Sequence, residues 1–189
     1  MPQGPGVLNI SLVWRSDGTT PSGTDAIYLD LCNRLVAALA RLDIVATPET
    51  VQGSFCDGRF NLAVGGRKLV GTAQSWRRVG RVPVALAHAV ILATCDAALL
   101  MERANAFEAA AGSGRRYRAN AVTTVAQSWC DAHGQAAPAF GTAGAAFVVL
   151  VVVFLAVFFG AAFASADRAT VATPIAATPT VAMKPIRTR

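Results

Sequence analysis

The residues with the clearest chemical potential are a cysteine and a lysine twelve positions apart, Cys56 and Lys68. They flank a predicted hairpin: residues 60–64 alternate as a half-buried strand does, Gly65-Gly66 is typical of a tight turn, and residues 67–73 return as the partner strand. A thiol near a cation has a lowered pKa and becomes a better nucleophile. The spacing therefore predicts a reactive thiol beside an ammonium group.

Each of these residues also has a simpler interpretation. A lone loop cysteine such as Cys56 is often a structural or neutral thiol, and Lys68 could be an ordinary exposed strand lysine. Gly71 would let a ligand approach the backbone closely, but lack of space for a side chain would explain a glycine at this position with or without a ligand. His88 lies between two alanines of an apolar segment, where it could shuttle protons or be a satisfied core histidine. Asn9 could line a pocket or satisfy the backbone at a strand end.

Four segments, in chain order, resemble the lipoate–protein ligase and octanoyltransferase family. They begin at Gly4, Cys56, His88 and Tyr117 and read GPGVLNIS, CDGRFNLAVGGRKLVGTAQ, HAVILATCD and YRANAVT. The resemblance covers roughly residues 4–128. It implies a biotin/lipoate ligase-like fold and transfer of a lipoyl or octanoyl group to a lysine of a lipoyl-acceptor protein domain.

The resemblance also assigns roles. Lys68 matches the lysine that contacts the acyl-adenylate in the ligases, and Cys56 matches the acyl-carrying nucleophile of the amidotransferase branch. A ligase would need ATP and lipoate, whereas a transferase would need nothing beyond its acyl donor. The residues expected to bind substrate are Asn9, Gly71, Thr72, Ala73 and His88, and no metal site is expected.

The chain departs from the family pattern in two ways. The Arg-Arg-x-x-Gly-Gly element of the family lies just upstream of the segment that matches residues 4–11, so we expect a truncated catalytic domain or a gene start placed too late. In addition, Asp57 stands where the amidotransferases usually have proline, and Asn61 stands where aspartate is usual. The alternative function is therefore a degenerate, non-catalytic membrane protein that keeps only part of the fold.

Composition excludes some classes of function. Residues 1–133 hold thirteen Lys/Arg against ten Asp/Glu, and residues 134–189 hold four against one. Neither part has the dense basic patch that nucleic-acid binding requires. The arginine clusters at 77, 78 and 81 and at 115, 116 and 118 are solvated loop charge or a contact surface for an acidic acceptor protein. Four dispersed cysteines indicate reduced thiols, not a disulfide framework.

Hydrophobic periodicity indicates an α+β fold with a mixed sheet and helices on one face. Thr24 or Ser22 is expected to cap the first helix, and Asp96 the second. The predicted elements are a strand at 7–14, a helix at 25–42, a hairpin at 54–76, a strand at 82–94 and a helix at 96–111.

The composition changes after His133. Residues 145–164 form an apolar run without charge, long enough to span about 30 Å as a helix, so a single transmembrane helix is expected, with an aggregating strand as the alternative. The predicted organisation is thus a partial catalytic domain at 1–133, a membrane helix at 145–164 and a disordered tail at 165–189. The family implies a cytoplasmic catalytic part, whereas the positive-inside rule places the tail in the cytoplasm.

Overall fold

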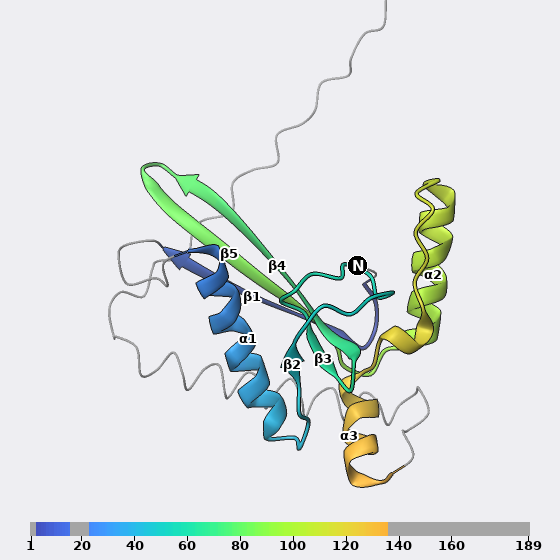
Figure 1. Cartoon of the computed structure of the whole chain (residues 1–189). Coiled ribbons are helices and arrows are strands. Elements are labelled where there is room, and N and C mark those ends of the chain that lie inside the picture. Colours follow the sequence, from blue (N-terminus) through green and yellow to red (C-terminus); the bar gives the residue numbers. More distant parts are fainter. Residues whose placement is uncertain (1–2, 16–22, 136–189) are drawn as a thin grey trace, which may run out of the picture.

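The computed structural model describes residues 3–15 and 23–135 of the chain. These residues form one sheet with helices around it (Figure 1). In chain order the elements are β1 (Val7–Arg15), α1 (Thr24–Ala40), β2 (Thr47–Pro48), β3 (Leu62–Val64), β4 (Arg67–Val79), β5 (Val82–Leu92), α2 (Ala97–Ala110), the 3-10 helix η1 (Ala119–Ala121) and α3 (Val125–His133).

The sheet has the strand order β1-β5-β4-β3-β2. The expectation of a mixed sheet is wrong for the described residues, because all four pairs of neighbouring strands are antiparallel. Tight turns explain the direction in two of these pairs: β3, β4 and β5 follow one another through two-residue turns, which can join only antiparallel strands. The β3–β4 turn is the predicted Gly65-Gly66, and both glycines have the positive φ that such a turn needs.

Helix α1 covers one face of this sheet. Its apolar stripe, with Ile27, Leu31 and Leu35, is completely or almost completely buried. Opposite it, Ala87 and Ala89 of β5 are fully buried in the same cluster. Alanine side chains are short, so they allow the helix to pack closely on the strands.

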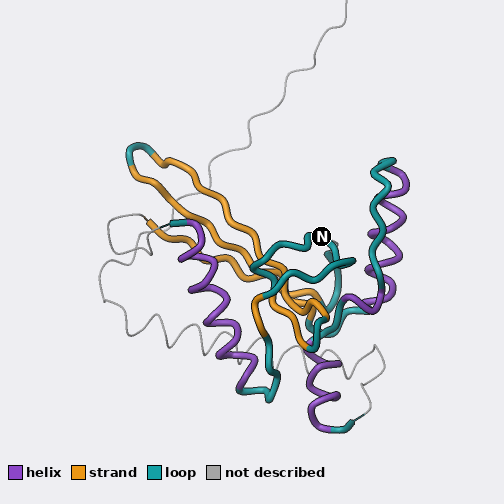
Figure 2. Tube along the Cα trace, in the orientation of Figure 1, coloured by secondary structure: helices purple, strands orange, loops and turns teal. Residues whose placement is uncertain are grey.

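Helix α2 does not pack on the sheet face that α1 covers, so the expectation that the helices lie on one face is wrong. Successive strand residues point to opposite faces. Ile91 of β5 belongs to the cluster under α1, whereas the next residue, Leu92, packs with Leu100 and Met101 of α2. Phe55 joins this second cluster. Figure 2 shows the long β4–β5 ribbon running from its turn to the loops that gather at the opposite end.

Several boundaries differ from those predicted. Gly23 precedes α1, so Thr24 is its first residue and not its cap, whereas Ser22 lies outside the described residues; no described side chain caps that helix. Asp96 caps α2 as predicted, its carboxylate accepting a bond from the Leu99 amide. The predicted membrane helix at 145–164 and the tail at 165–189 lie outside the described residues. Within the described ranges, no helix has the length and apolar character needed to cross a bilayer.

Candidate functional site

Cys56 is exposed on the loop that leads into β3. Its φ is +53°, a left-handed conformation that costs a non-glycine residue roughly 1–2 kcal/mol. Such strain persists only where neighbouring groups hold the backbone, and it often occurs at functional sites. The contacts of this loop therefore show how the thiol is positioned.

Lys68 holds the loop from beneath. Its side chain is fully buried, and its Nζ donates to the carbonyl oxygens of Phe55 at 2.6 Å and Cys56 at 2.8 Å. The structure thus brings Cys56 and Lys68 together as the sequence predicted, and it contradicts the alternative of an exposed strand lysine. Burial lowers the pKa of Lys68 to about 8, although the nearby Cys56 and Asp57 partly oppose this shift.

Two further residues support the same loop. Asn61 is buried, and its Nδ2 donates to the Cys56 carbonyl at 2.7 Å. Arg118 donates to the Gln52 carbonyl from its side chain at 2.7 Å and to the Gly53 carbonyl from its backbone at 2.8 Å. Sequence reasoning noted Asn61 only as a departure from the family pattern, and Arg118 only as part of an arginine cluster, so it missed that both residues support the Cys56 loop.

Cys56 lies between two pockets. One has a volume of about 400 Å³, and its lining includes Phe55, Ala104, Phe107 and Tyr117. The other has a volume of about 390 Å³ and is more polar; its lining includes Ser54, Asp57, Arg115 and Arg116. A thiol at this boundary can meet a substrate that has an apolar chain on one side of its reacting carbon and a polar carrier on the other.

Tyr117, which lines the apolar pocket, is fixed to α2 by hydrogen bonds. The Tyr117 hydroxyl donates to Glu108 at 2.5 Å, and the Ser113 hydroxyl donates to the same carboxylate. Asn105 pairs with the Tyr117 backbone through two hydrogen bonds of 2.7 and 2.9 Å. The bonds from Ser113 and Tyr117 lower the pKa of Glu108, and Glu108 raises the pKa of Tyr117. The loop before η1 is therefore anchored rather than loosely placed over the pocket.

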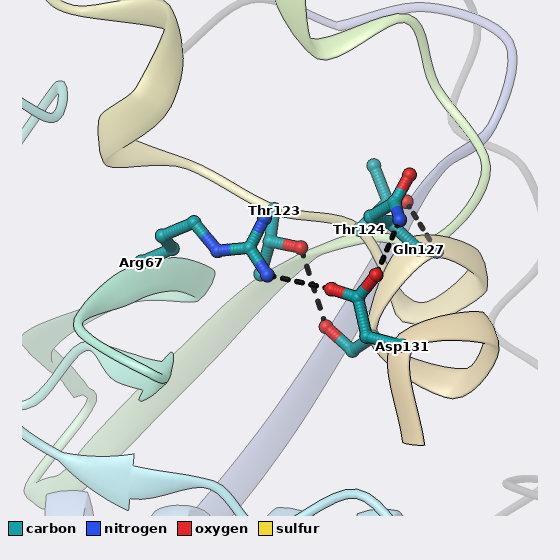
Figure 3. A network of polar contacts seen from close by, with 6 residues as sticks. Arg67, Thr123, Thr124, Gln127 and Asp131 are labelled. Carbon is teal, nitrogen blue, oxygen red and sulfur yellow. Dashed lines mark hydrogen bonds and ion pairs between the residues drawn. The ribbon is translucent and has the colours of Figure 1, made fainter. Parts of the chain in front are cut away.

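Helix α3 is tied to the start of β4, next to Lys68 (Figure 3). Arg67 and Asp131 form an ion pair at 2.7 Å, and Gln127 donates to the other oxygen of the same carboxylate at 2.6 Å. The Thr124 hydroxyl caps the helix by accepting from the Gln127 amide at 3.1 Å. The bonds from Arg67 and Gln127 lower the pKa of Asp131.

A second group of predicted residues lies together on the sheet face opposite α1. Ser11 and Ala73 stand on either side of His88 in the strand register, and Asn9 is on the same face as Ser11. The Ser11 hydroxyl lies 2.8 Å from His88 Nδ1, and Asn9 Oδ1 lies 3.1 Å from Nε2. In a neutral ring, Nε2–H donates to Asn9 and Nδ1 accepts from Ser11. The prediction missed Ser11, although it is two residues from Asn9 on the same strand.

Gly71 shares that face, whereas Thr72 does not. Thr72 points to the α1 side, where its hydroxyl donates to the Phe60 carbonyl at 2.7 Å. The structure thus separates the predicted residues into the pair Cys56 and Lys68, a group of Asn9, Gly71, Ala73 and His88 on the sheet face, and Thr72 alone. In the described part of the chain, no three His, Cys, Asp or Glu side chains are grouped to hold a metal ion.

Comparison with known proteins gives relatives in sequence and structure, although no family model matches the chain. An uncharacterized protein of Cupriavidus necator is 44% identical over an alignment of 140 residues, and the match covers 68% of this chain and 55% of that protein. The octanoyl-[GcvH]:protein N-octanoyltransferase of Kyrpidia tusciae is 37% identical over an alignment of 132 residues, and the match covers 66% of this chain and 45% of that enzyme. The chain spans about half the length of these relatives.

The fold has a counterpart among solved structures. A candidate lipoate protein ligase from Thermoplasma acidophilum superposes with a TM-score of 0.51 at 20% identity, over 85% of this chain and 52% of the other. At that identity the likeness concerns the fold alone, and it agrees with the sequence relationship to the octanoyltransferase. The chain therefore has the fold of the lipoate–protein ligase and octanoyltransferase family and is related in sequence to an octanoyltransferase.

Proposed function

We propose that this chain is an acyltransferase that moves an octanoyl or lipoyl group through Cys56 to a lysine of a lipoyl-acceptor domain. One observation carries the proposal: Cys56 is exposed between an apolar and a polar pocket, on a loop held by the buried Lys68. The 37% identity to an octanoyltransferase supports it. The apolar pocket takes the acyl chain, and its volume falls in the usual range for small-molecule sites.

The proposed transfer has two steps. First, the Cys56 sulfur attacks the acyl carbon of the donor; the bond between the acyl group and its carrier breaks, and the carrier leaves with the thiol proton. Second, the acceptor amine attacks the resulting thioester, so that an amide forms, the amine gives up a proton and the thiol is restored. A covalent intermediate splits one difficult transfer into two easier ones.

Lys68 suits a role in moving that proton. With a pKa of about 8, a substantial fraction of its amine is neutral at physiological pH. A neutral amine has two hydrogens, which are enough for the carbonyls of Phe55 and Cys56, and its lone pair is then free to accept a proton. Asn9, Gly71, Thr72, Ala73 and His88 remain predicted substrate-binding residues.

A ligase mechanism is the alternative within the family, with ATP activating lipoate and Lys68 contacting the acyl-adenylate. It requires an acyl-adenylate to reach the third Nζ hydrogen of a fully buried Lys68, because the other two are donated to the carbonyls of Phe55 and Cys56. The transferase mechanism uses the site as it stands, and for this reason we favour it.

The test is acylation of a purified acceptor. The full chain is incubated with octanoyl-[GcvH] as donor and an E2 lipoyl domain as acceptor, and the masses of both the chain and the acceptor are followed. We expect a hydroxylamine-labile octanoyl group on Cys56 and no transfer by Cys56→Ser. Transfer by Cys56→Ser that depends on ATP and lipoate would favour the ligase, and no acylation under either condition would favour the degenerate alternative.

The proposed membrane attachment has its own test. If residues 145–164 span a bilayer, the expressed protein resists extraction by alkaline carbonate, and arginines at Val152 and Leu155 make it extractable. Release of the unchanged protein by carbonate would contradict the membrane assignment.

A further inference from the structure

The hairpin formed by β4 and β5 extends beyond the strands that flank it. β1 pairs with β5 only as far as Val84, and β3 pairs with β4 only up to Val70. Among the described residues, no further strand pairs with residues 78–83, and Figure 1 shows the turn projecting past the end of β1. We call residues 76–82 the hairpin tip.

The hairpin tip is rich in positive charge. It contains Arg77, Arg78 and Arg81, and no acidic residue occurs between Lys68 and Asp96. Arg77 and Arg78 are neighbours in a strand and therefore lie on opposite faces, while Arg81 is in the turn, so the charge surrounds the tip. Within the described ranges, none of these three arginines forms an ion pair.

Exposed apolar side chains accompany these charges. Trp76 is 42% exposed and Val79 is 67% exposed. An isolated two-stranded ribbon is at best marginally stable in water, and these side chains contribute little burial to the fold. Tryptophan and arginine are enriched in the centres of protein interfaces, where they carry much of the binding energy.

We propose that the hairpin tip is the docking surface for an acidic protein domain, namely the domain that receives the acyl group. The identity of the partner rests on the proposed function. A protein fits better than a nucleic acid as the partner. A protein that binds nucleic acid through its phosphate backbone makes roughly 6–10 phosphate contacts, and three arginines provide fewer than that. Charged groups at such a surface raise the rate of encounter and fix the orientation of the partner.

The distance along β4 matches the size of such a domain. Lys68 and Arg77 stand at opposite ends of this strand, and nine residues at about 3.3 Å each separate them by about 30 Å. A compact domain of about 80 residues has a radius of gyration of about 12 Å, hence a diameter of about 30 Å. One small domain lying along the hairpin therefore reaches the tip with one end and the Cys56 loop with the other.

The test measures binding separately from catalysis. The full chain is titrated with an unacylated, strongly acidic E2 lipoyl domain at low and at physiological salt. We expect affinity to fall with salt, and the combined Arg77→Glu, Arg78→Glu and Arg81→Glu variant to bind at least ~10-fold more weakly. The matched control replaces the same residues with lysine, which keeps the charge, and should bind within about threefold of the original protein. An Arg→Gln version at the three positions replaces the glutamate variant if that one fails to fold.

The outcomes separate this proposal from the proposed function. If binding depends on the arginines but no variant acylates the domain, the docking surface stands and the acyltransferase activity does not. If the folded glutamate variant binds and acylates the domain as well as the original protein, the activity stands and the docking surface is overturned. Arginine-dependent binding to phosphatidylserine vesicles or to single-stranded DNA, without binding of the lipoyl domain, would also overturn it.

Discussion

Replacing Lys68 with methionine tests whether a buried amine with a shifted pKa lies beneath the Cys56 loop. The unfolded chain holds this amine at its ordinary pKa of 10.5, whereas burial lowers the pKa in the folded protein to about 8. Between these values the unfolded state binds more protons than the folded state. The free energy of unfolding therefore rises with pH in this window, because the cost of the buried charge disappears.

The size of the effect follows from the shift. One pKa unit corresponds to about 1.4 kcal/mol, so the shift amounts to about 3 kcal/mol over the whole window. About 2 kcal/mol of this falls between pH 8 and pH 10. The methionine variant lacks this dependence, and it also leaves the Phe55 carbonyl without its Lys68 donor, which adds a constant loss of about 1–3 kcal/mol.

Urea unfolding of the full chain at pH 7, 8, 9 and 10 provides the measurement. Subtracting the variant from the original protein removes the titration of groups that both share. Lys68→Arg is the control, because a guanidinium stays charged throughout this range and gives no slope of its own. We expect the original protein to gain about 2 kcal/mol over both variants between pH 8 and pH 10. Equal slopes for all three proteins would show that Lys68 does not titrate there and would refute the argument.

Two further substitutions test the supports of the site. Gly53 has a φ of +78°, and an added Cβ would lie 2.5 Å from Nε of Arg118, so Gly53→Ala should destabilise by about 1–2 kcal/mol in thermal unfolding. Gly58→Ala, which meets no atom within 4 Å, should stay within about 0.5 kcal/mol of the original. Asp131→Asn removes an exposed ion pair and should cost at most about 1 kcal/mol at pH 7. Because the folded pKa of Asp131 is lowered, this difference should begin to shrink as the pH falls below about 4 and be lost as the pH passes below the lowered pKa, and a difference that is undiminished at pH 2 would contradict it.

Local patterns were sufficient to predict most of the elements. The spacing of apolar residues marked α1, the Gly65-Gly66 turn marked the β3–β4 hairpin, and Asp96 marked the start of α2. For the β1–β5 and β2–β3 pairs, which no tight turn joins, the direction could not be read in the same way, because alternation is identical in parallel and antiparallel pairs. The extent of β4 was also underestimated, since residues 77–79 are polar or exposed and are strand only through pairing with β5.

The candidate site was predictable in its residues but not in its environment. The spacing of Cys56 and Lys68 pointed to a thiol beside an amine. The burial of Lys68 depends on residues 53–57 folding over it. Arg118, which is 66 residues after Gln52 in the sequence, fixes that loop by donating to the Gln52 carbonyl. Such a contact between distant segments leaves no local pattern. Thr72 is a different case, because strand alternation alone separates it from Gly71 and Ala73.

The departure at Asn61 has a direct physical consequence for Lys68. Asn61 Nδ2 and Lys68 Nζ donate to the Cys56 carbonyl at 2.7 and 2.8 Å, so the two nitrogens lie at most about 5.5 Å from each other. The aspartate usual in the family would place a carboxylate beside the ammonium, raise its pKa and keep it charged. With asparagine the amine lacks that partner and can become neutral near pH 8. In the Asn61→Asp variant, the free energy of unfolding should therefore rise at a higher pH than it does in the original protein. If that rise stays in place in the aspartate variant, Asn61 does not control the protonation of Lys68.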